Sequence, residues 1–310
     1  MSLVHDFTQI QLKNAWLAIG VFDGVHLGHR YMLQSLVDGA RTNGVPSVVM
    51  TFDPHPAEVL GNQPGFQWLT PAQERVAEFQ SLGVKHIIMQ QFDRSFAGIE
   101  AGEFMLALSR QIGLHHLLVG YDFALGRDRQ GNADVLEAIG KNLGYELNRI
   151  EPVRDGSGNI ISSTRIRSLL QQGNVSQSGS LLGRSYALTG RVVHGDGRGH
   201  TINIPTANLK LPADKLVPAR GVYACRAWLG SQNWLAVTNI GTRPTFTSGE
   251  QVSHVETHLL DFDQQVYGNE MRLEFMYRLR DEQRFPSVEA LVTQIQSDIS
   301  QARRLMNQPG

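Results

Sequence analysis

The pattern of apolar residues changes once along the chain, near Gly183, and this change limits the folds that the chain can adopt. Before it, short apolar runs alternate with stretches of helical periodicity, at residues 16–22, 46–52, 85–89, 116–119 and 145–150. Alternating strands and helices are typical of a parallel sheet covered on both faces, so residues 1–183 are predicted to form a Rossmann-like, doubly wound domain. Thr70 is expected to cap one of its helices, with Pro71 at the first helical position and Gly83 at the end.

After Gly183 the strand-like runs are no longer separated by helices. They cover residues 186–194, 221–229, 234–240, 253–260 and 271–279 and are rich in Val, Ile, Tyr and Trp. Residues 184–310 are therefore predicted to form an antiparallel β-barrel or sandwich. An amphipathic helix after Pro286 is expected to pack on it rather than bind a separate partner. Residues 171–180 have the composition of a connector, although a short helix is also compatible with them.

Composition excludes several kinds of protein. The 310 residues carry 28 Lys and Arg against 29 Asp and Glu, a net charge of −1, which argues against a protein that coats nucleic acid. The single Cys225 forms no internal disulfide and no multi-thiolate metal site. No segment approaches the roughly 18 to 20 apolar residues of a membrane span, and the start of the chain does not resemble a secretory signal. These features predict a cytoplasmic protein with no membrane or nucleic-acid partner.

A turn suited to phosphate chemistry follows the first predicted strand, at residues 20–30. At the carboxyl edge of a parallel sheet, backbone N–H groups and a helix N-terminus favour an anion. His26 and His29 flank Gly28 there, so that a phosphate has room to approach and two imidazoles can donate to its oxygens. The alternative is that one histidine caps the helix and the other is solvated. A P-loop is excluded, because no Gly-Lys-Ser or Gly-Lys-Thr stands at a comparable junction.

The sequence His26-Leu27-Gly28-His29 resembles the signature of the nucleotidyltransferase superfamily. Three further segments, residues 51–56, 120–131 and 161–167, follow in the order found in bacterial bifunctional riboflavin kinase/FMN adenylyltransferases, also called FAD synthetases. The resemblance implies a nucleotidyltransferase-type sheet that transfers AMP from ATP to FMN. It implies catalytic roles for His26 and His29, and an ATP site made by Gly20, Phe22, Asp23, Gly28, Asp122, Ser163, Thr164 and Arg167.

Local chemistry supports part of this assignment and leaves alternatives. Ser163 stands where a helix cap is expected, and Arg167 adds fixed charge for a triphosphate, although plain capping explains Ser163 equally well. Asp122 is either a hydrogen-bond acceptor for adenosine or an exposed loop acid.

A flavin site is expected in the loop that contains Phe52, Pro54 and Pro56. The prolines stiffen this loop, and the phenylalanine offers an apolar face for an isoalloxazine ring. A rigid structural turn would have the same sequence, so the residues alone do not decide between these readings.

A second phosphate site is predicted after the first barrel strand. Gly195, Gly197 and Gly199 allow successive N–H groups to form an anion nest. Thr206 and Asn208 offer two oxygens to a hard cation, and Mg²⁺ commonly takes few protein ligands together with phosphates. A β-hairpin with polar turn residues is the alternative.

Further segments match the riboflavin kinase domain of the same family, at residues 181–184, 205–208, 221–224, 239–246 and 255–258. The resemblance implies a riboflavin kinase-type barrel with a C-terminal helix. In it Glu256 takes the proton of the ribityl hydroxyl, Asn208 contributes to ATP binding, and Thr206 and Asn208 hold Mg²⁺. Asn203 stands where the family usually has glycine, which restricts the loop, although Asn tolerates left-handed backbone better than most residues.

The predicted function is flavin cofactor synthesis, in which riboflavin is phosphorylated to FMN and FMN is adenylylated to FAD, each with one ATP. The expected ligands are riboflavin, FMN, FAD, ATP and ADP, with Mg²⁺ as cofactor. One alternative is that one domain is inactive, or that the first domain adenylylates another phosphate ester. The other is a protein that binds flavin or nucleotide without turnover.

Overall fold

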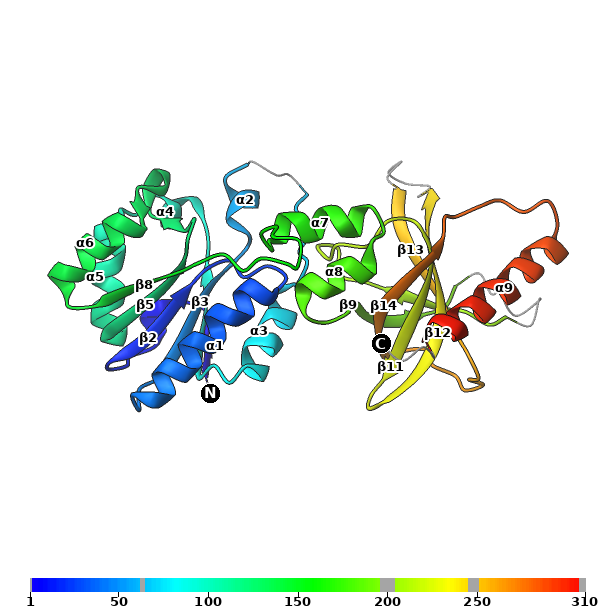
Figure 1. Ribbon diagram of the computed structural model, residues 1–310, viewed down its shortest axis with the longest axis horizontal. Coiled ribbons are helices and arrows are strands. Elements are labelled where there is room, and N and C mark those ends of the chain that lie inside the picture. Colours follow the sequence, from blue (N-terminus) through cyan, green and yellow to red (C-terminus); the bar gives the residue numbers. More distant parts are fainter. Residues whose placement is uncertain (1, 62–64, 196–203, 245–250, 307–310) are drawn as a thin grey trace. The chain divides into compact units, whose positions relative to one another are not determined.

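The computed structural model describes residues 2–61, 65–195, 204–244 and 251–306 (Figure 1). The chain divides into two compact units, Met1–Ser163 and Thr164–Gly310.

The first unit is built on a six-stranded parallel sheet with the order β1-β4-β3-β2-β5-β8. Its strands are β1 (Ser2–Val4), β2 (Ala15–Ile19), β3 (Ser47–Asp53), β4 (His86–Gln91), β5 (Leu114–Gly120) and β8 (Glu146–Ile150). The doubly wound fold is thus confirmed, and the short β1 was not predicted. The strand order reverses between β2 and β5, and sheets of this kind bind ligands outside the carboxyl ends of the strands at that point.

Helices cover both faces of this sheet (Figure 1). On one face α1 (Leu27–Thr42) and α3 (Ala72–Ser81) pack on Ala18 and its neighbours. On the other face α5 (Ala101–Ile112) and α6 (Ala133–Leu143) pack on Leu17 and Ile19. Successive strand residues point to opposite faces, so β2 supplies both cores. Shorter elements are η1 (Phe7–Gln9), α2 (Pro56–Val59), α4 (Arg94–Ala97), η2 (Arg127–Arg129) and the two-stranded ribbon of β6 (Ala124–Leu125) and β7 (Gly131–Asn132).

The predicted cap of α3 is wrong. The N-cap residue is Pro71, and no side chain makes a capping hydrogen bond. The Thr70 hydroxyl is buried and finds no hydrogen-bond partner in the described parts of the chain. Its N–H instead donates to Asp23 Oδ1 at 3.1 Å. Thr70 thus contacts the loop after β2 through its backbone, and its hydroxyl does not cap the helix.

The second unit is a closed antiparallel barrel with the order β10-β13-β12-β11-β14-β9, which confirms the barrel prediction. Its strands are β9 (Tyr186–Val193), β10 (Ala207–Lys210), β11 (Gly221–Leu229), β12 (Gln232–Pro244), β13 (Gln251–Leu259) and β14 (Glu270–Arg280). The C-terminal helix α9 (Val288–Met306) packs on the barrel as expected, with Ala302 buried against Val222 and Val237. The carboxylate of Asp298 on this helix accepts hydrogen bonds from Arg280 of β14 at 2.8–3.1 Å.

Two helices precede the barrel, α7 (Ser163–Gln171) and α8 (Val175–Leu182), so residues 171–180 are mostly helical. Beyond Ser163 they belong to the second unit. The Leu170 carbonyl accepts the N–H of Ala219 at 2.9 Å, and α8 buries Leu181 and Leu182. The predicted boundary at Gly183 thus lies inside the second compact unit.

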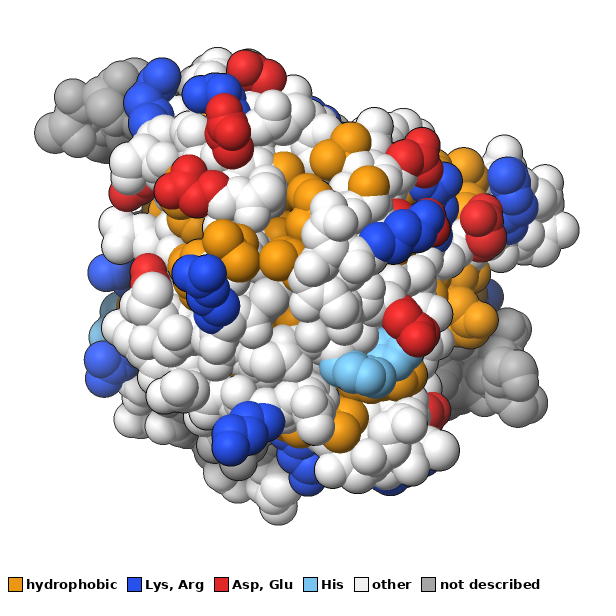
Figure 2. Space-filling model, turned by 90° about the vertical axis from the view of Figure 1, so that its left-hand side faces the viewer, with side chains coloured by type: hydrophobic (Ala, Val, Ile, Leu, Met, Phe, Trp, Pro, Cys, Tyr) orange, Lys and Arg blue, Asp and Glu red, His pale blue; other side chains and the backbone are white. Residues whose placement is uncertain are grey.

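The described residues include no helix long and apolar enough to cross a membrane. On the face shown in Figure 2, the coloured basic and acidic side chains are interspersed. Cys225 lies buried on β11, and burial raises the pKa of its thiol.

Candidate functional site

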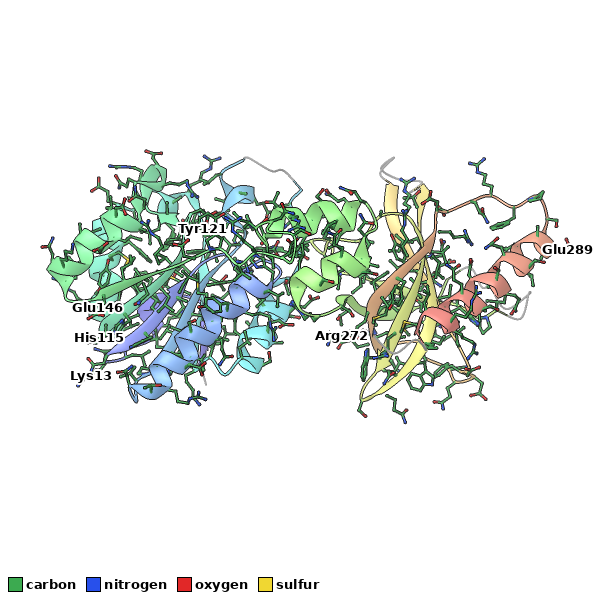
Figure 3. The ribbon with its side chains drawn as sticks, in the orientation of Figure 1. Lys13, His115, Tyr121, Glu146, Arg272 and Glu289 are labelled. Carbon is green, nitrogen blue, oxygen red and sulfur yellow. The ribbon has the colours of Figure 1, made fainter. Side chains whose placement is uncertain are left out.

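Most of the residues predicted for the first unit lie in the loops that follow its parallel strands. Figure 3 marks the two ends of this sheet, with Lys13, His115 and Glu146 at the amino end and Tyr121 at the carboxyl end. The turn with the two histidines follows β2, and residues 121–131 follow β5. These are the two strands between which the order reverses, so the fold brings the two loops to one edge of the sheet.

The two histidines lie against each other at the start of α1. His26 is the N-cap residue, and its Nδ1 accepts the N–H of His29 at 3.3 Å, so the neutral ring carries its proton on Nε2. The two rings stack with 3.7 Å between their centroids. A Cβ on residue 28 would lie 3.2 Å from the His26 ring, so Gly28 gives this ring its space. Helix capping and a ligand role are therefore compatible at His26.

The backbone of this turn is unusual. Phe22 has a φ of 54° and Val25 a φ of 40°, a region that bulky and β-branched residues rarely adopt. Strain of this kind persists only where the surrounding structure enforces it, and it gathers at functional sites. The Phe22 ring packs edge-on against His29 with 5.2 Å between centroids and thereby supports it from below the turn. Gly20, at the end of β2, donates its N–H to the Met50 carbonyl at 3.1 Å.

His29 has one polar atom without a hydrogen-bond partner among the described residues. Its Nδ1 is buried and makes no hydrogen bond within the described part of the chain. Burial, together with the neighbouring His26, holds the pKa of His29 well below its usual 6.5, so the ring is neutral at pH 7. A neutral imidazole can still donate one hydrogen bond to a phosphate oxygen.

Asp23 ties the turn to other segments. It is buried, accepts the Thr70 N–H through Oδ1, and accepts the Ser163 hydroxyl through its carbonyl at 2.7 Å. Ser163 is thereby brought to the histidine turn. Thr164 and Arg167 belong to the second unit, so their role at this site stays a prediction.

Asp122 is exposed on the loop after β5, and its carbonyl accepts a hydrogen bond from Arg129 at 3.2 Å. The contact involves backbone, so the carboxylate's role in binding adenosine stays a prediction.

The residues predicted to bind flavin are placed differently from one another. Phe52 is buried, and its ring packs against Phe92 and Phe96 with 5.6 and 6.0 Å between centroids. Pro54 is exposed, and Pro56 is the first residue of α2. The Phe52 ring is thus part of an aromatic cluster of the core, and a flavin role for these residues stays a prediction.

Arg75 was missed by the sequence reasoning. Its fully buried guanidinium donates to the Val21 carbonyl, the Thr51 hydroxyl and the Phe52 carbonyl at 2.8–3.0 Å, and it lies 3.9 Å from the centre of the Trp68 ring. It thereby joins the loop after β2 to the end of β3. The available signal was that this arginine precedes Phe79 by four residues and so shares its buried helix face.

In the second unit, Asn208 occupies a close-packed position on β10. A Cβ on residue 195 would lie 2.0 Å from Asn208 Nδ2, so Gly195 is needed for the two segments to approach. The Oδ1 atom of Asn208 is buried without a hydrogen-bond partner among the described residues. Thr206 is half-buried immediately before β10. Gly197, Gly199 and Asn203 lie outside the described residues.

Glu256 lies between two asparagines. On β13 it is directly opposite Asn208 of β10 and Asn239 of β12, and directly opposite residues of antiparallel strands share one face. Val255 and Thr257 on either side of it are buried, so Glu256 faces away from the barrel interior. Its Oε1 is 2.7 Å from His254 Nε2. The structure thus brings Glu256 and Asn208 together, and adds Asn239 and His254, which the sequence reasoning missed.

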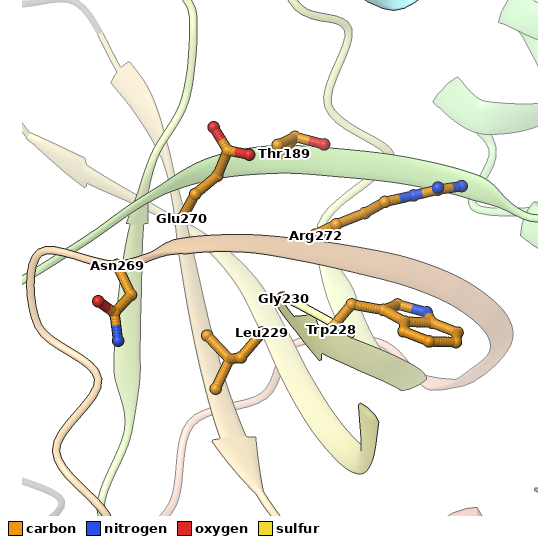
Figure 4. A pocket seen from close by; sticks show the side chains of 7 residues that line it. All are labelled: Thr189, Trp228, Leu229, Gly230, Asn269, Glu270 and Arg272. Atoms are coloured by element: carbon orange, nitrogen blue, oxygen red, sulfur yellow. The ribbon is translucent and has the colours of Figure 1, made fainter. Parts of the chain in front are cut away.

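Another hollow lies elsewhere on the barrel (Figure 4). This pocket of about 720 Å³ is lined by Thr189, Trp228, Leu229, Gly230, Asn269, Glu270 and Arg272. None of the predicted site residues lines it. No group of three or more His, Cys, Asp or Glu side chains suited to a metal occurs among the residues that the structure describes.

Comparisons with known proteins match the two parts of the chain to different families. Residues 8–165 match the family described as FAD synthetase, and residues 182–306 match the family described as riboflavin kinase. The chain is 37% identical over 302 residues to a bifunctional riboflavin kinase/FMN adenylyltransferase of Escherichia coli K12, covering 97% of this chain and 95% of the relative. It is 38% identical over 288 residues to a protein of the same name from Pseudomonas fluorescens, covering 93% and 91%.

One solved structure is similar over nearly its whole length. It is described as a macrolide-efflux protein from Streptococcus pneumoniae, and the match has a TM-score of 0.90 at 31% identity over 99% of both chains. The efflux description applies to that protein.

Proposed function

The chain belongs to the family of bifunctional riboflavin kinase/FMN adenylyltransferases, and from this premise we propose which of its residues carry out each reaction. The protein converts riboflavin to FMN and FMN to FAD, with ATP as co-substrate of both steps. Adenylyl transfer is proposed for the first unit and riboflavin phosphorylation for the second, which is supported by the FAD synthetase match at residues 8–165 and the riboflavin kinase match at residues 182–306.

In the first unit, we propose that an oxygen of the FMN phosphate attacks the α-phosphorus of ATP. The new O–P bond forms as the bond to the bridging oxygen breaks and pyrophosphate leaves. His26 and His29 donate hydrogen bonds to the oxygens on which charge develops, and their fixed orientation supports this role. The reaction needs no nucleophile from the enzyme.

The remaining residues of this site are proposed to position the substrates. Ser163, Thr164 and Arg167 hold the β- and γ-phosphates, and Asp122 accepts hydrogen bonds from the adenosine. The other members of the ATP site are Gly20, Phe22, Asp23 and Gly28. Phe52, Pro54 and Pro56 form the side of the site that receives the flavin.

In the second unit, Glu256 is proposed to take the proton of the riboflavin 5′-hydroxyl. The hydroxyl oxygen then forms a bond to the γ-phosphorus of ATP while the bond to the β–γ bridging oxygen breaks, giving FMN and ADP. Positioning and charge neutralisation supply most of the acceleration in such transfers. The register that sets Glu256 opposite Asn208 supports this assignment, because it puts the base beside the proposed nucleotide site.

Mg²⁺ fits the donors of this site. Thr206 offers a hydroxyl and Asn208 an amide oxygen, and the buried Oδ1 of Asn208 has no partner in the described part of the protein. Hard oxygen donors in small number, completed by phosphates, suit this ion. When bound, the ion would neutralise charge on the phosphates. Gly195, Gly197 and Gly199 are proposed to hold the nucleotide beside it. A cytoplasmic location is also part of the proposal, and cell fractionation checks it.

The observation that carries this proposal is that each proposed site contains a buried polar atom without a described protein partner, His29 Nδ1 in one and Asn208 Oδ1 in the other. Other buried polar atoms among the described residues, such as the Thr70 hydroxyl and Trp228 Nε1, also have no partner, whereas His29 and Asn208 are residues that the family resemblance assigns to ligand binding. Two separate sites follow, with separable activities.

Two substitutions test this separation. Glu256→Ala should lower the rate of FMN formation by at least ~100-fold and leave the conversion of FMN to FAD unchanged. His29→Ala should do the reverse. Chromatography of the flavins, with circular dichroism as a check of folding, measures both. Loss of both reactions from either substitution in a folded protein would contradict two separate sites.

A further inference from the structure

The strand that carries Glu256 presents a second ionisable side chain to it. His254 lies two residues earlier on β13, on the same face of the barrel wall. Its Nε2 is 2.7 Å from Glu256 Oε1, and the two side chains are 24% and 29% exposed. Because a carboxylate only accepts hydrogen bonds, the proton of a neutral His254 stands on Nε2, which donates to Glu256.

The neighbouring strands set uncharged residues opposite this pair. Glu256 is in register with Asn208 and Asn239, and His254 is in register with Gly241 of β12. A Cβ on residue 241 would lie 2.6 Å from Glu282 Oε1, so the missing side chain of Gly241 leaves room for this carboxylate. The alternation of side chains along β13 thus brings a histidine to the carboxylate of Glu256, and its imidazole can donate one hydrogen bond to Oε1.

A carboxylate that removes a proton from a hydroxyl has to be held in place. A glutamate side chain rotates about three bonds, and freezing that motion costs free energy during the reaction unless the protein has already done so. A hydrogen bond to one carboxylate oxygen restricts rotation of the group and so narrows the range of directions in which the other oxygen points. The contact at Oε1 thereby orients Oε2.

We propose that His254 is a positioning residue of the riboflavin kinase reaction, and that it holds Oε1 of Glu256 so that Oε2 receives the proton of the riboflavin 5′-hydroxyl. The inference rests on the proposed role of Glu256 as the base. The hydroxyl proton moves to Glu256, the oxygen bonds to the γ-phosphorus, and the bond to ADP breaks. His254 keeps its own proton throughout.

Two substitutions at His254 in the full-length protein test this inference. His254→Leu removes the donor, and kcat for FMN formation should fall roughly tenfold while KM for riboflavin and for ATP changes less than about twofold. His254→Gln keeps an N–H donor near the position of Nε2 and should restore most of kcat. The conversion of FMN to FAD by the same preparations reports whether the chain is folded and should not change. A structural role for His254 alone would not give rescue by glutamine.

A variant at Glu256 separates this inference from the assignment of the base. In a Glu256→Asp background the shorter side chain withdraws from His254, so adding His254→Leu should have little further effect on kcat. If Glu256→Gln loses kinase activity while His254→Leu keeps the wild-type kcat, the positioning role is refuted and the base stands. If Glu256→Gln remains fully active, the base and this inference both fail.

Folding of the leucine variant is not required for a decision. If that variant does not fold, His254→Asn replaces it, since the asparagine amide is too short to reach Glu256. A kcat for His254→Asn equal to that of His254→Gln would then overturn the inference.

Discussion

At the residue scale, the two proposed sites share one construction. In each, a glycine permits a close approach, Gly28 to the His26 ring and Gly195 to the Asn208 amide. Each also leaves one buried polar atom without a hydrogen bond among the described residues, on His29 and on Asn208. An unsatisfied buried polar group lowers the free energy of unfolding by about 1–3 kcal/mol, so both sites make the folded chain less stable. A substrate that supplies the missing partner recovers this free energy on binding.

The depressed pKa of His29 predicts a pH dependence of stability. The unfolded chain binds a proton at this histidine near pH 6.5, whereas the folded chain binds it only at a lower pH. Below pH 6.5 the unfolded state therefore holds more protons, and the free energy of unfolding falls as the pH is lowered.

Going from about pH 7.5 to about pH 5.5, the wild type should lose about 1 kcal/mol more than His29→Gln. Denaturant unfolding of both proteins at the two pH values measures this, and the other titrating groups cancel in the comparison. Equal losses in both proteins would show that His29 titrates normally in the folded state.

Single residues were predictable only where they belong to a motif. The histidine turn, Asn208 and Glu256 carry recognisable neighbours in the sequence, which is why they could be proposed in advance. Arg75 and His254 carry none. The four-residue spacing to Phe79 signals that Arg75 is buried, and the two-residue spacing to Glu256 puts His254 on the same strand face. The atoms that these side chains contact depend on tertiary packing, which the spacing does not give.

At the scale of elements, the prediction succeeded where an element is long enough to show its period. The long strands and α9 were found, whereas β1 and β10, of three and four residues, were not. Such short strands contain too few alternations to be distinguished from loop. The cap at Thr70 failed for a different reason, since the N-cap residue of α3 is Pro71, one position after the threonine.

Arg75 connects elements, and its removal should destabilise the first unit. Arg75→Met deletes three hydrogen bonds, and it leaves the carbonyls at the ends of β2 and β3 without this donor. The free energy of unfolding should fall by roughly 3 kcal/mol. The stability of Arg75→Lys should lie between those of Arg75→Met and the wild type, since lysine keeps the charge but lacks the planar guanidinium with its several N–H donors.

Arg41→Met on the exposed side of α1 is the matched control and should change stability little. Chemical denaturation followed by the loss of FMN adenylylation compares the proteins. If Arg75→Met were as stable as the wild type, the hydrogen bonds of Arg75 would contribute nothing to the free energy of unfolding.

At the scale of the whole molecule, the chain joins two unlike folds. The position of the junction depends on whether it is defined by sequence pattern, by compactness or by the family matches. The change of apolar pattern is at Gly183, the compact units meet after Ser163, and the family matches end at residue 165 and resume at 182. The sequence pattern distinguishes kinds of secondary structure, whereas compactness depends on which surfaces pack together. Helices α7 and α8 are helical, like much of the first half of the chain, but they pack with the second half.

This packing predicts that the kinase unit needs its two leading helices. A fragment of residues 164–310 retains α8, which buries Val175, Leu181 and Leu182, while a fragment of residues 184–310 loses them and uncovers the barrel surface beneath. Burying one such side chain contributes about 1.5–3 kcal/mol, a large share of a domain's stability. The shorter fragment should therefore melt at least about 10 °C lower and form less FMN at 37 °C. Residues 174–310, which keep α8 without α7, separate the two contributions. Equal melting temperatures for the longest and shortest fragments would instead make the barrel self-sufficient and place the folding boundary at Gly183.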